Sequence, residues 1–415
     1  MSRPLRVAVV ARSVFPLHGR GGLERHVYDL VRHLADRDHQ VTLITKRTPE
    51  VQPANSIHPN ITLTTIPYRT FPLAGRRGTT VIDRSTAYPL FGERAGRAAW
   101  ELVRDGRIDV VHGLGASVLG YARRRKTSTA PLVLNPQGLE EFGGTDPRRA
   151  RLKRFGYLPL RRAVVACARA ADRVIATDRS LEPAVLEHLR IGRERITLIP
   201  NAIDLDWLDS LATAEDVDRV RRETGVKPQD TVLLSVGRLE QNKGFHILAE
   251  ALGALAHHGA LSGRWRWVVV GDGPYRGTLE RAVDRAGIRE HVTLAGRAED
   301  SNLHAWYEAA TLFVHPTLYE GSSLVTLEAM AHRRAVVASN AGGLPDKVRP
   351  ANGWLVEPGR PSDLAAAVSG ALDQRQRLAA MGAAGREIVE REFAWPAVTS
   401  SLIDLYRQLL DVTRS

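Results

Sequence analysis

The sequence predicts an α/β protein made of two doubly wound domains that face each other across a cleft. Short β-branched runs alternate with amphipathic helical segments along the chain, as in parallel sheets that are covered by helices. The 415 residues exceed what one ordinary core holds. A proline-led turn, I-P-N-A-I-D at 199–204, separates two series of strands and marks the predicted domain boundary.

Each predicted domain has its own series of strands. In the first domain, residues 1–200, strands are expected at 6–10, 41–45, 110–112, 132–135 and 173–176, with a helix at 23–35. In the second domain, residues 201–394, strands are expected at 231–236, 265–270, 292–294, 312–315, 336–339 and 354–356. Helices are expected there at 245–256, 275–286, 303–310 and 364–372. Doubly wound domains bind ligands at the carboxyl ends of their strands, so the predicted site lies in the cleft.

The composition is that of a soluble globular protein, with 43% apolar and 25% charged residues. Cys167 is the one cysteine, which excludes an intramolecular disulfide framework and favours a reducing, cytoplasmic compartment. Arg12 interrupts the apolar N-terminus, so we expect a first strand there and not a signal peptide. No apolar run approaches the roughly 18–20 residues of a membrane span.

Positive charge is concentrated in the first half of the chain. Residues 1–200 hold 34 Lys and Arg against 18 Asp and Glu, a net charge of +16, while the remainder has a net charge of −4. This asymmetry indicates that the first domain meets an anionic partner, such as lipid headgroups, a phosphorylated substrate or nucleic acid. The alternative is an arginine-rich composition that has no functional meaning.

The stretch S-V-G-R-L-E-Q-N-K-G-F at 235–245 joins a predicted strand to a predicted helix. Arg238 and Lys243 flank this loop, and a cation at a helix N-terminus opposes the helix dipole. A bound anion reverses that penalty, because helix N-termini together with Arg and Lys suit phosphate. The loop therefore predicts a phosphate site, and the alternative is a pair of solvated cations.

The stretch L-Y-E-G-S-S-L-V-T-L-E-A-M at 318–330 carries two glutamates eight residues apart. Its Gly-Ser-Ser precedes a predicted helix, so the first backbone N–H groups would face a ligand, with either serine as an alternative N-cap. Eight residues along a helix span about 12 Å, which is too far for glycosidase carboxylates at ~5–9.5 Å. Glu320 and Glu328 are therefore predicted to hold two ends of one nucleotide-sugar, and the alternative for Glu328 is a surface acid.

A third glycine turn, H-G-R-G-G-L-E-R-H at 18–26, follows the first predicted strand. Gly21 and Gly22 would let the backbone approach a diphosphate closely. The turn is not G-x-G-x-x-G and no acidic residue clearly ends a second strand, so a dinucleotide site is not predicted. The triplets D-R-D and D-L-D are attributed to chance, and no Cys/His cluster has zinc spacing. We expect neither a metal nor a cofactor.

These motifs, in their order along the chain, resemble one family. R-L-x4-K-G-F, V-V-G-D-G-P, E-G-S-S-L-V-T-L-E-A, S-N-A-G-G-L-P-D and N-G-W-L-V-E-P-G closely resemble the retaining family 4 glycosyltransferases of GT-B fold. The resemblance spans almost the whole chain, and the two glutamates look like the family's E-x7-E pair. It implies two Rossmann-like domains, with a C-terminal helix in 395–415 that crosses back to pack on the first domain.

The resemblance implies a role for each candidate residue on the donor side. Glu320 would lie at the donor sugar near the reacting centre, and Glu328 would accept hydrogen bonds from the ribose hydroxyls. Arg238 and Lys243 would hold the diphosphate leaving group in place of a metal ion. The other donor contacts would be the amides of Ser323, Leu324 and Val325, the turn Gly21 and Gly22 at the diphosphate, and Gly296 and Arg297 beside the base.

The chain departs from the family pattern in three places. The family often has E-G-F-G-L where this chain has E-G-S-S-L, which affects contacts to the outer hydroxyls of the sugar. D-V-V-H at 109–112 keeps His112, but Leu114 takes the place of a second histidine, so a structural role is the alternative for His112. Gln137 stands where family members often have histidine. We expect His112 and Gln137 on the acceptor side.

The acceptor is predicted less directly than the donor. The segment 148–162 interleaves Arg and Lys with aromatic residues, and R-R-R-K at 123–126 adds charge to the same half. Such a surface could rest on an anionic membrane, and many family members use lipid-linked acceptors. We therefore expect a cytoplasmic enzyme that is peripheral on the membrane, and the alternative is a solvated arginine-rich face.

Taken together, the sequence predicts a retaining, metal-independent hexosyltransferase. It would move a sugar from a UDP- or GDP-linked donor to a hydroxyl of a glycan or a lipid-linked acceptor. A nucleotide-sugar epimerase is the alternative within the fold. A basic nucleic-acid-binding protein is the alternative from another class, suggested by a pI of about 10.2, but the acidic second half argues against it. We expect no nucleic-acid partner.

Overall fold

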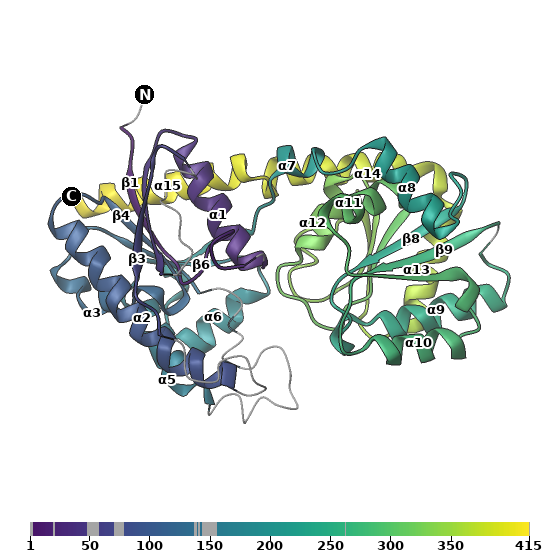
Figure 1. Ribbon diagram of the computed structural model, residues 1–415, viewed down its shortest axis with the longest axis horizontal. Helices are drawn as coiled ribbons and strands as arrows, with labels where there is room; N and C mark the ends of the chain where they lie inside the picture. The colour runs from purple at the N-terminus through teal and green to yellow at the C-terminus, as the bar shows by residue number, and fades with distance from the viewer. Residues whose placement is uncertain are drawn as a thin grey trace. The chain divides into compact units, whose positions relative to one another are not determined.

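The computed structural model describes residues 3–19, 21–47, 58–69, 79–136, 139, 142, 156–261 and 263–414. The chain forms two compact units, Met1–Asn201 together with Trp395–Ser415, and Ala202–Ala394. The boundary between them lies inside the turn at 199–204. The last helix therefore belongs to the first unit (Figure 1).

The first unit is built on a parallel sheet, which has seven strands in the described part of the chain. Their order is β3-β2-β1-β4-β5-β6-β7. The strands are β1 (Arg6–Val10), β2 (Gln40–Lys46), β3 (Ile61–Ile66), β4 (Val110–Leu114), β5 (Leu132–Asn135), β6 (Arg173–Ala176) and β7 (Ile196–Leu198). The sequence did not predict β3 and β7. Both are edge strands and largely half-buried, so they lack the continuous apolar run by which the inner strands were recognised.

The longest helix of the first unit, α2 (Thr79–Arg104), was also not predicted. Pro89, Gly92 and Gly96 lie inside it, and all three are signals against a helix. A Cβ on Gly92 would overlap the carbonyl oxygen of Ala116, so the glycine allows α2 to pack against the segment that follows β4. Tertiary packing here outweighs helix propensity. The described residues of this unit also form α1 (Gly22–Ala35), α3 (Leu119–Arg123), α5 (Leu158–Ala170) and α6 (Leu181–Leu189).

The C-terminal helix α15 (Trp395–Arg414) packs against α1 in the first unit (Figure 1). Trp395 and Tyr406 of this helix are fully buried. The indole of Trp395 stacks on His33, with ring centroids 5.5 Å apart and 14° between the planes. The expected packing of this helix on the first unit is confirmed.

The second unit is built on a parallel sheet of six strands within the described residues, in the order β10-β9-β8-β11-β12-β13. The strands are β8 (Thr231–Val236), β9 (Trp265–Val270), β10 (Val292–Gly296), β11 (Leu312–His315), β12 (Val336–Ser339) and β13 (Gly353–Val356). Strands β8 and β11 are neighbours in the sheet but far apart in sequence, so the strand order reverses between them. Ligands of doubly wound sheets bind at such a reversal.

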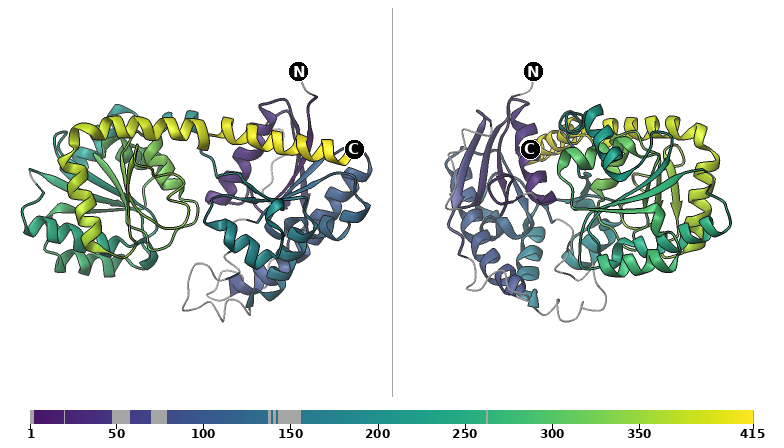
Figure 2. Two further views of the ribbon diagram at one scale, coloured as in Figure 1. Left: turned by 180° about the vertical axis from the view of Figure 1, so that it is seen from behind. Right: turned by 45° about the vertical axis from the view of Figure 1, so that its right-hand side comes forward.

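Helices cover both faces of the second sheet (Figure 2). One core cluster joins the sheet to α9 (Phe245–His257), α10 (Arg276–Arg285) and α13 (Pro361–Asp373). The other joins it to α7 (Leu205–Asp209), α8 (Ala214–Thr224), α11 (Asp300–Ala309) and α12 (Leu324–Ala331). Helix α14 (Arg375–Ile388) continues into a π-helical turn, Val389–Phe393. This architecture confirms the predicted fold class.

The basic stretches of the first unit are only partly described. Most of 148–162 lies outside the described residues. In 123–126, Arg123 and Arg124 each lie 2.8 Å from a carboxylate oxygen of Glu93, and Arg125 pairs with Asp172 at 2.8 Å. Much of this charge is therefore neutralised locally. Among the helices that the structure describes, none combines the length and the apolar character that a membrane crossing requires.

Candidate functional site

The candidate site of the second unit lies at the carboxyl ends of β8 and β11. The loop after β8 and the loop after β11 are joined by hydrogen bonds, since Leu318 N donates to Asn242 O at 2.7 Å and Thr317 Oγ1 donates to the same oxygen at 3.0 Å. Gly244 is the N-cap of α9 with a φ of 67°, and a Cβ there would overlap the carbonyl oxygen of Pro316. Glycine is therefore required where the two loops meet.

The joined loops bring Lys243 and Glu320 into direct contact. Lys243 Nζ lies 2.7 Å from Oε2 of Glu320. His315, the last residue of β11, places its Nε2 at 2.7 Å from the same oxygen. A carboxylate only accepts hydrogen bonds, so both Lys243 and His315 donate. The side chains of Lys243 and Glu320 are 18% and 13% exposed, and that of His315 is fully buried.

This environment keeps Glu320 ionised. Burial alone would raise the pKa of its carboxyl, but the hydrogen bond and charge of His315, together with Lys243, outweigh burial and lower the pKa to about 2. Glu320 therefore carries a negative charge across the physiological pH range. It has no proton to donate there, and it is a poor base, so its chemical contribution is charge and geometry.

Arg238 has a different environment from Lys243. Arg238 follows Gly237, and its side chain is 69% exposed with Nε 3.2 Å from Oε1 of Glu240. Of the two predicted phosphate ligands, only Lys243 is therefore held by the buried part of the site. Arg238 has the exposure of a solvated loop cation, and its role on the diphosphate stays a prediction.

The Gly-Ser-Ser turn leads into α12, which begins at Leu324. Ser323 is its N-cap, and its Oγ accepts from Thr326 N at 3.4 Å. The predicted helix start after Gly-Ser-Ser is confirmed. Glu320 precedes the helix by four residues, so the estimate of about 12 Å wrongly applied helical rise to all eight residues between the glutamates. The chain turns at Gly-Ser-Ser before the helix starts, and only the part after Ser323 has helical rise. Leu324 and Val325 are the first two residues of α12.

The position of Glu320 depends on a second loop. Gly342, after β12, has a φ of 55°, and a Cβ there would overlap the backbone oxygen of Glu320. The buried side chain of Lys347 reaches the same turn, where Nζ donates to Ser322 Oγ at 3.2 Å and to Gly343 O at 3.3 Å. The S-N-A-G-G-L-P-D motif therefore supports the turn that carries Glu320.

Glu328 lies within α12 and is half-buried. Tyr307 in α11 donates its hydroxyl to Oε2 of Glu328 at 2.8 Å. Burial raises the pKa of Glu328, and the Tyr307 hydrogen bond opposes this shift only in part. The hydrogen bond from Tyr307 thus fixes the orientation of the carboxyl group, which distinguishes Glu328 from a solvated surface acid.

The remaining donor candidate residues lie on loops of both units. Gly296 ends β10 with a φ of 72°, and its carbonyl oxygen accepts from Gly271 N at 2.7 Å, while the following Arg297 is exposed. In the first unit, Gly21 is the N-cap of α1 and Gly22 is its first residue. Both are exposed and neither has a positive φ. These positions leave the backbone accessible, and their donor roles stay predictions.

Of the two residues predicted on the acceptor side, the structure describes only His112. His112 is buried, and its Nδ1 lies 2.6 Å from the hydroxyl of Tyr406 in α15. Burial, followed by the charge of His26, lowers the pKa of His112 to about 3. Its observed contact is therefore structural, with the C-terminal helix. Gln137 lies outside the described residues.

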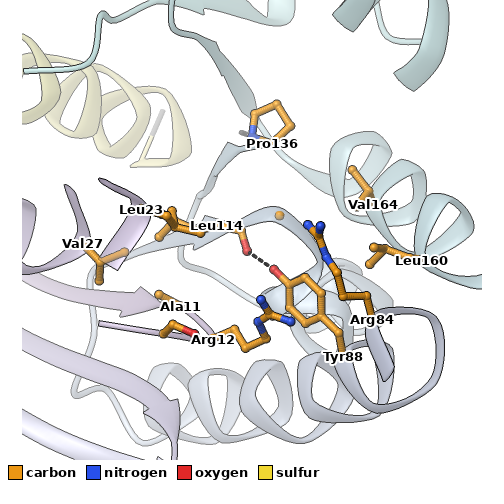
Figure 3. Close-up of a pocket in the computed structure, with 12 residues that line it drawn as sticks. Ala11, Arg12, Leu23, Val27, Arg84, Tyr88, Leu114, Pro136, Leu160 and Val164 are labelled. Carbon is orange, nitrogen blue, oxygen red and sulfur yellow. Dashed lines mark hydrogen bonds between the residues drawn. The ribbon is translucent and has the colours of Figure 1, made fainter. Parts of the chain in front are cut away.

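The first unit has a pocket at the carboxyl ends of β1, β4 and β5 (Figure 3). Arg12, Arg84 and Tyr88 bring polar groups to it, and the guanidinium of Arg12 lies 4.9 Å from the centroid of the Tyr88 ring. The Tyr88 hydroxyl donates to the carbonyl oxygen of Leu114 at 3.0 Å. The other lining residues are Ala11, Ser13, Leu23, Val27, Leu114, Gly115, Pro136, Leu160 and Val164. Two cations and no carboxylate among these residues favour an anionic ligand.

Sequence reasoning missed four groups of this arrangement. His315 ends a strand five residues before Glu320, and that position at a strand's carboxyl end was the available signal. Tyr307 and the pocket arginines Arg12 and Arg84 belong to helices or loops whose partners only the fold brings near. No local pattern marks them.

Two family models match the chain, one for each unit. The model described as Glycosyltransferase Family 4 matches residues 20–207, and the model described as Glycosyl transferases group 1 matches residues 216–388. D-inositol 3-phosphate glycosyltransferase of Thermobispora bispora is 29% identical over 98% of this chain and 95% of its own length. GDP-mannose-dependent alpha-(1-6)-phosphatidylinositol monomannoside mannosyltransferase of Mycobacterium tuberculosis is 33% identical over 50% of this chain and 55% of its own length.

Solved structures resemble the whole chain in fold. Sucrose-phosphate synthase of Thermosynechococcus elongatus has a TM-score of 0.74 at 23% identity, over 98% of this chain and 100% of that chain. HepE of Anabaena, in complex with UDP, has a TM-score of 0.70 at 20% identity, over 98% of this chain and 100% of that chain. At such identities the likeness shows the fold alone.

The two parallel α/β units have the GT-B fold of these solved structures. The two family models together reach from residue 20 to residue 388. The chain belongs to glycosyltransferase family 4 and is an enzyme of glycosyl transfer, which confirms the resemblance that its motifs indicate.

Proposed function

We propose that this protein is a retaining, metal-independent hexosyltransferase that uses a UDP- or GDP-linked donor. The observation that carries the proposal is the ionised Glu320 between Lys243 and His315 at the carboxyl end of the second sheet. A fixed carboxylate with an adjacent ammonium group provides both signs of charge at one place. A sugar-nucleotide needs both, since positive charge develops on the sugar while negative charge develops on the leaving diphosphate.

In the proposed mechanism the enzyme positions two substrates and stabilises charge. The bond between the anomeric carbon and the diphosphate oxygen breaks, and the acceptor hydroxyl bonds to the same face of that carbon. The acceptor's proton passes to the leaving phosphate oxygen. Glu320 lies beside the sugar, while Lys243, with Arg238, neutralises the diphosphate as it departs. Glu328 accepts hydrogen bonds from the ribose at the other end of the donor.

The backbone around the site supports donor binding in this proposal. The amides of Ser323, Leu324 and Val325 surround the first turn of α12, where a helix N-terminus favours an anion. Gly296 and Arg297 would lie beside the base, and Gly22 would approach the diphosphate from the first unit. No cofactor is needed, because the diphosphate is itself a good leaving group.

On the acceptor side we propose a hydroxyl of a glycan or lipid-linked molecule that carries a phosphate. The pocket with Arg12 and Arg84 supports this proposal, because its described lining offers two cations and no carboxylate. Relatives named for inositol 3-phosphate and for a phosphatidylinositol mannoside support it as well. A lipid-linked acceptor would bring the enzyme to the cytoplasmic face of a membrane, where the net charge of +16 in residues 1–200 favours anionic lipid.

Donor-induced thermal stabilisation in EDTA tests the proposal. We expect one UDP- or GDP-sugar to raise the melting temperature of the wild-type protein without any divalent metal, because a ligand that binds only the folded state stabilises it. Glu320→Gln and Lys243→Met should still fold, and both should lose transfer activity. Stabilisation that requires a divalent metal, or a product that is an isomerised donor and no glycoside, contradicts the proposal.

A further inference from the structure

Glu328, the residue proposed to hold the ribose, is itself held by a fully buried tyrosine. The hydroxyl of Tyr307 donates to Oε2 of Glu328 at 2.8 Å. It also lies 3.2 Å from the carbonyl oxygen of Val325, in the first turn of the same helix. One hydroxyl is thus fixed between the backbone of α12 and the carboxylate. The oxygen of Glu328 that Tyr307 does not contact is Oε1.

The ring of Tyr307 is fixed by two buried imidazoles. Its plane lies 5° from that of His332, with ring centroids 5.4 Å apart, and His304 lies 5.7 Å away. His304 Nδ1 lies 2.7 Å from His332 Nε2, and His332 Nδ1 lies 2.6 Å from Oε1 of Glu308. The chain of contacts Glu308–His332–His304 therefore forms a rigid support under the tyrosine ring.

The Glu308–His332–His304 contacts support the ring and do not form a ligand site. Among the residues that the structure describes, no three acidic, histidine or cysteine side chains have the arrangement of metal ligands. Neither imidazole contacts Glu328, and the group that does reach its carboxylate is the Tyr307 hydroxyl. His332 acts on the Glu328 carboxyl through its charge, and the group that hydrogen-bonds to this carboxyl is the hydroxyl of Tyr307.

Two charged side chains, His332 and Asp300, act on the carboxyl of Glu328. Burial raises its pKa, the hydrogen bond from Tyr307 and the nearby His332 lower it, and Asp300 in α11 raises it. On the other helices that pack on α12, Asp209 of α7 and Arg386 of α14 pair with each other at 2.7 Å. The Tyr307 hydroxyl is therefore the direct donor that favours the ionised carboxylate, and only the ionised form accepts at both oxygens.

We propose that Tyr307 is a positioning residue for donor binding: its hydroxyl occupies Oε2 of Glu328 and leaves Oε1 to accept from the ribose hydroxyls. The inference rests on the proposed ribose role of Glu328. It predicts that an enzyme without this hydroxyl loses its preference for a nucleotide that has the ribose hydroxyls, while the rest of the nucleotide still binds.

Calorimetry with nucleotide pairs tests this role. UDP, GDP and their 2′,3′-dideoxy forms are titrated into wild type, Tyr307→Phe and the matched control Tyr121→Phe. Tyr121 is a buried tyrosine of the first unit whose hydroxyl donates to Ala130 O. We expect wild type and the control to prefer the ribose form about tenfold or more, and Tyr307→Phe to prefer it by less than about threefold. The affinity of Tyr307→Phe for the ribose form should also fall at a higher pH than that of wild type.

The outcomes distinguish a failure of the positioning role of Tyr307 from a failure of the proposed donor site. A Tyr307→Phe protein that discriminates as strongly as wild type overturns the positioning role. A wild-type protein that binds neither nucleotide, or does not distinguish the ribose form, overturns the proposed donor site instead. If Tyr307→Phe does not fold, Glu308→Gln is measured in the same way, since Glu308 is 40% exposed and supports the ring only through His332. Its discrimination should fall below that of wild type, and unchanged discrimination overturns the inference.

Discussion

Lys243 Nζ lies 2.7 Å from Oε2 of Glu320, although 77 residues separate the two in sequence. The contact joins the loop after β8 to the loop after β11, at the point where the strand order of the second sheet reverses. It turns two motifs that are distant in sequence into one charged group of the site. The proposed chemistry depends on this contact more than on any single motif.

Removing the charge of Glu320 should abolish most of the activity and leave the fold intact. Glu320→Gln keeps the shape of the side chain but loses the carboxylate that Lys243 and His315 hold. We expect kcat to fall by about 10²-fold or more, as when one preorganised electrostatic group is removed. Steady-state kinetics and circular dichroism measure the two effects. The exposed Glu223→Gln in α8 is the control. Wild-type kcat in Glu320→Gln would remove Glu320 from the mechanism.

The apparent affinity for the donor should decrease at low pH because Glu328 has a raised pKa. Its ionised form is the one that accepts from the ribose, and burial moves its protonation above the ordinary glutamate range. Glu320, with a pKa of about 2, stays ionised over the same interval. The measurement is kcat/KM for the donor between pH 5 and pH 8. Glu328→Gln should have a low kcat/KM that does not decrease further toward low pH. An unchanged decrease in that variant would mean that another group titrates.

A methyl group at Gly342 should disturb the site through the backbone. Gly342→Ala meets an unfavourable positive φ and also overlaps the carbonyl oxygen of Glu320, so we expect a loss of about 2–4 kcal/mol of stability together with a lower kcat. Gly259→Ala is the matched control, because its φ is 65° and no atom lies within 4 Å of the added Cβ. That variant should lose about 1 kcal/mol and keep its kcat. Melting curves and kinetics compare the two, and equal effects would contradict the role of Gly342.

The first unit should lose stability as the pH falls below the pKa of an ordinary histidine. The pKa of His112 is lowered to about 3, so the folded protein keeps it neutral while the unfolded chain takes up a proton below about pH 6.5. At pH 5 this difference costs about 2 kcal/mol. Above pH 7 both states are neutral and the cost vanishes.

Replacing His112 isolates this contribution. His112→Gln should be less stable than wild type at pH 7.5, because Tyr406 loses its partner at 2.6 Å. The difference in unfolding free energy between wild type and this variant should narrow by about 2 kcal/mol at pH 5. Hydrogen exchange in α15 at both pH values measures it, since this helix carries Tyr406. A constant difference would show that His112 does not titrate in this way.

The central parts of both sheets were predictable because a fully buried parallel strand has a continuous apolar run. The strands β1, β5, β8 and β11 have the bounds that the sequence predicts. The edge strands β3 and β7 were not predictable, since half-exposed strands mix polar and apolar residues. The glycine-rich α2 was missed for another reason, because its glycines serve helix packing.

The site was predictable where a motif carries the residue. Glu320, Lys243 and Glu328 lie in motifs, and the structure gives each a specific polar partner. His315 and Tyr307 were missed because their partners come from the fold. The helix start after Gly-Ser-Ser was predictable from its serines, and Ser323 is the N-cap. The distance estimate between the two glutamates was less sound, since it applied helical rise to residues that precede the helix.

Hydrolysis of nucleotide-sugars without acceptor tests whether Glu320 belongs to a retaining, metal-independent site. Wild type and Glu320→Gln are incubated in EDTA with UDP- and GDP-linked hexoses, and the released nucleoside diphosphate and the anomeric form of the sugar are followed by NMR. We expect wild type to hydrolyse one donor slowly with retained configuration, and Glu320→Gln not to do so. Hydrolysis that needs a divalent metal, an inverted product, or equal rates in both proteins would contradict it.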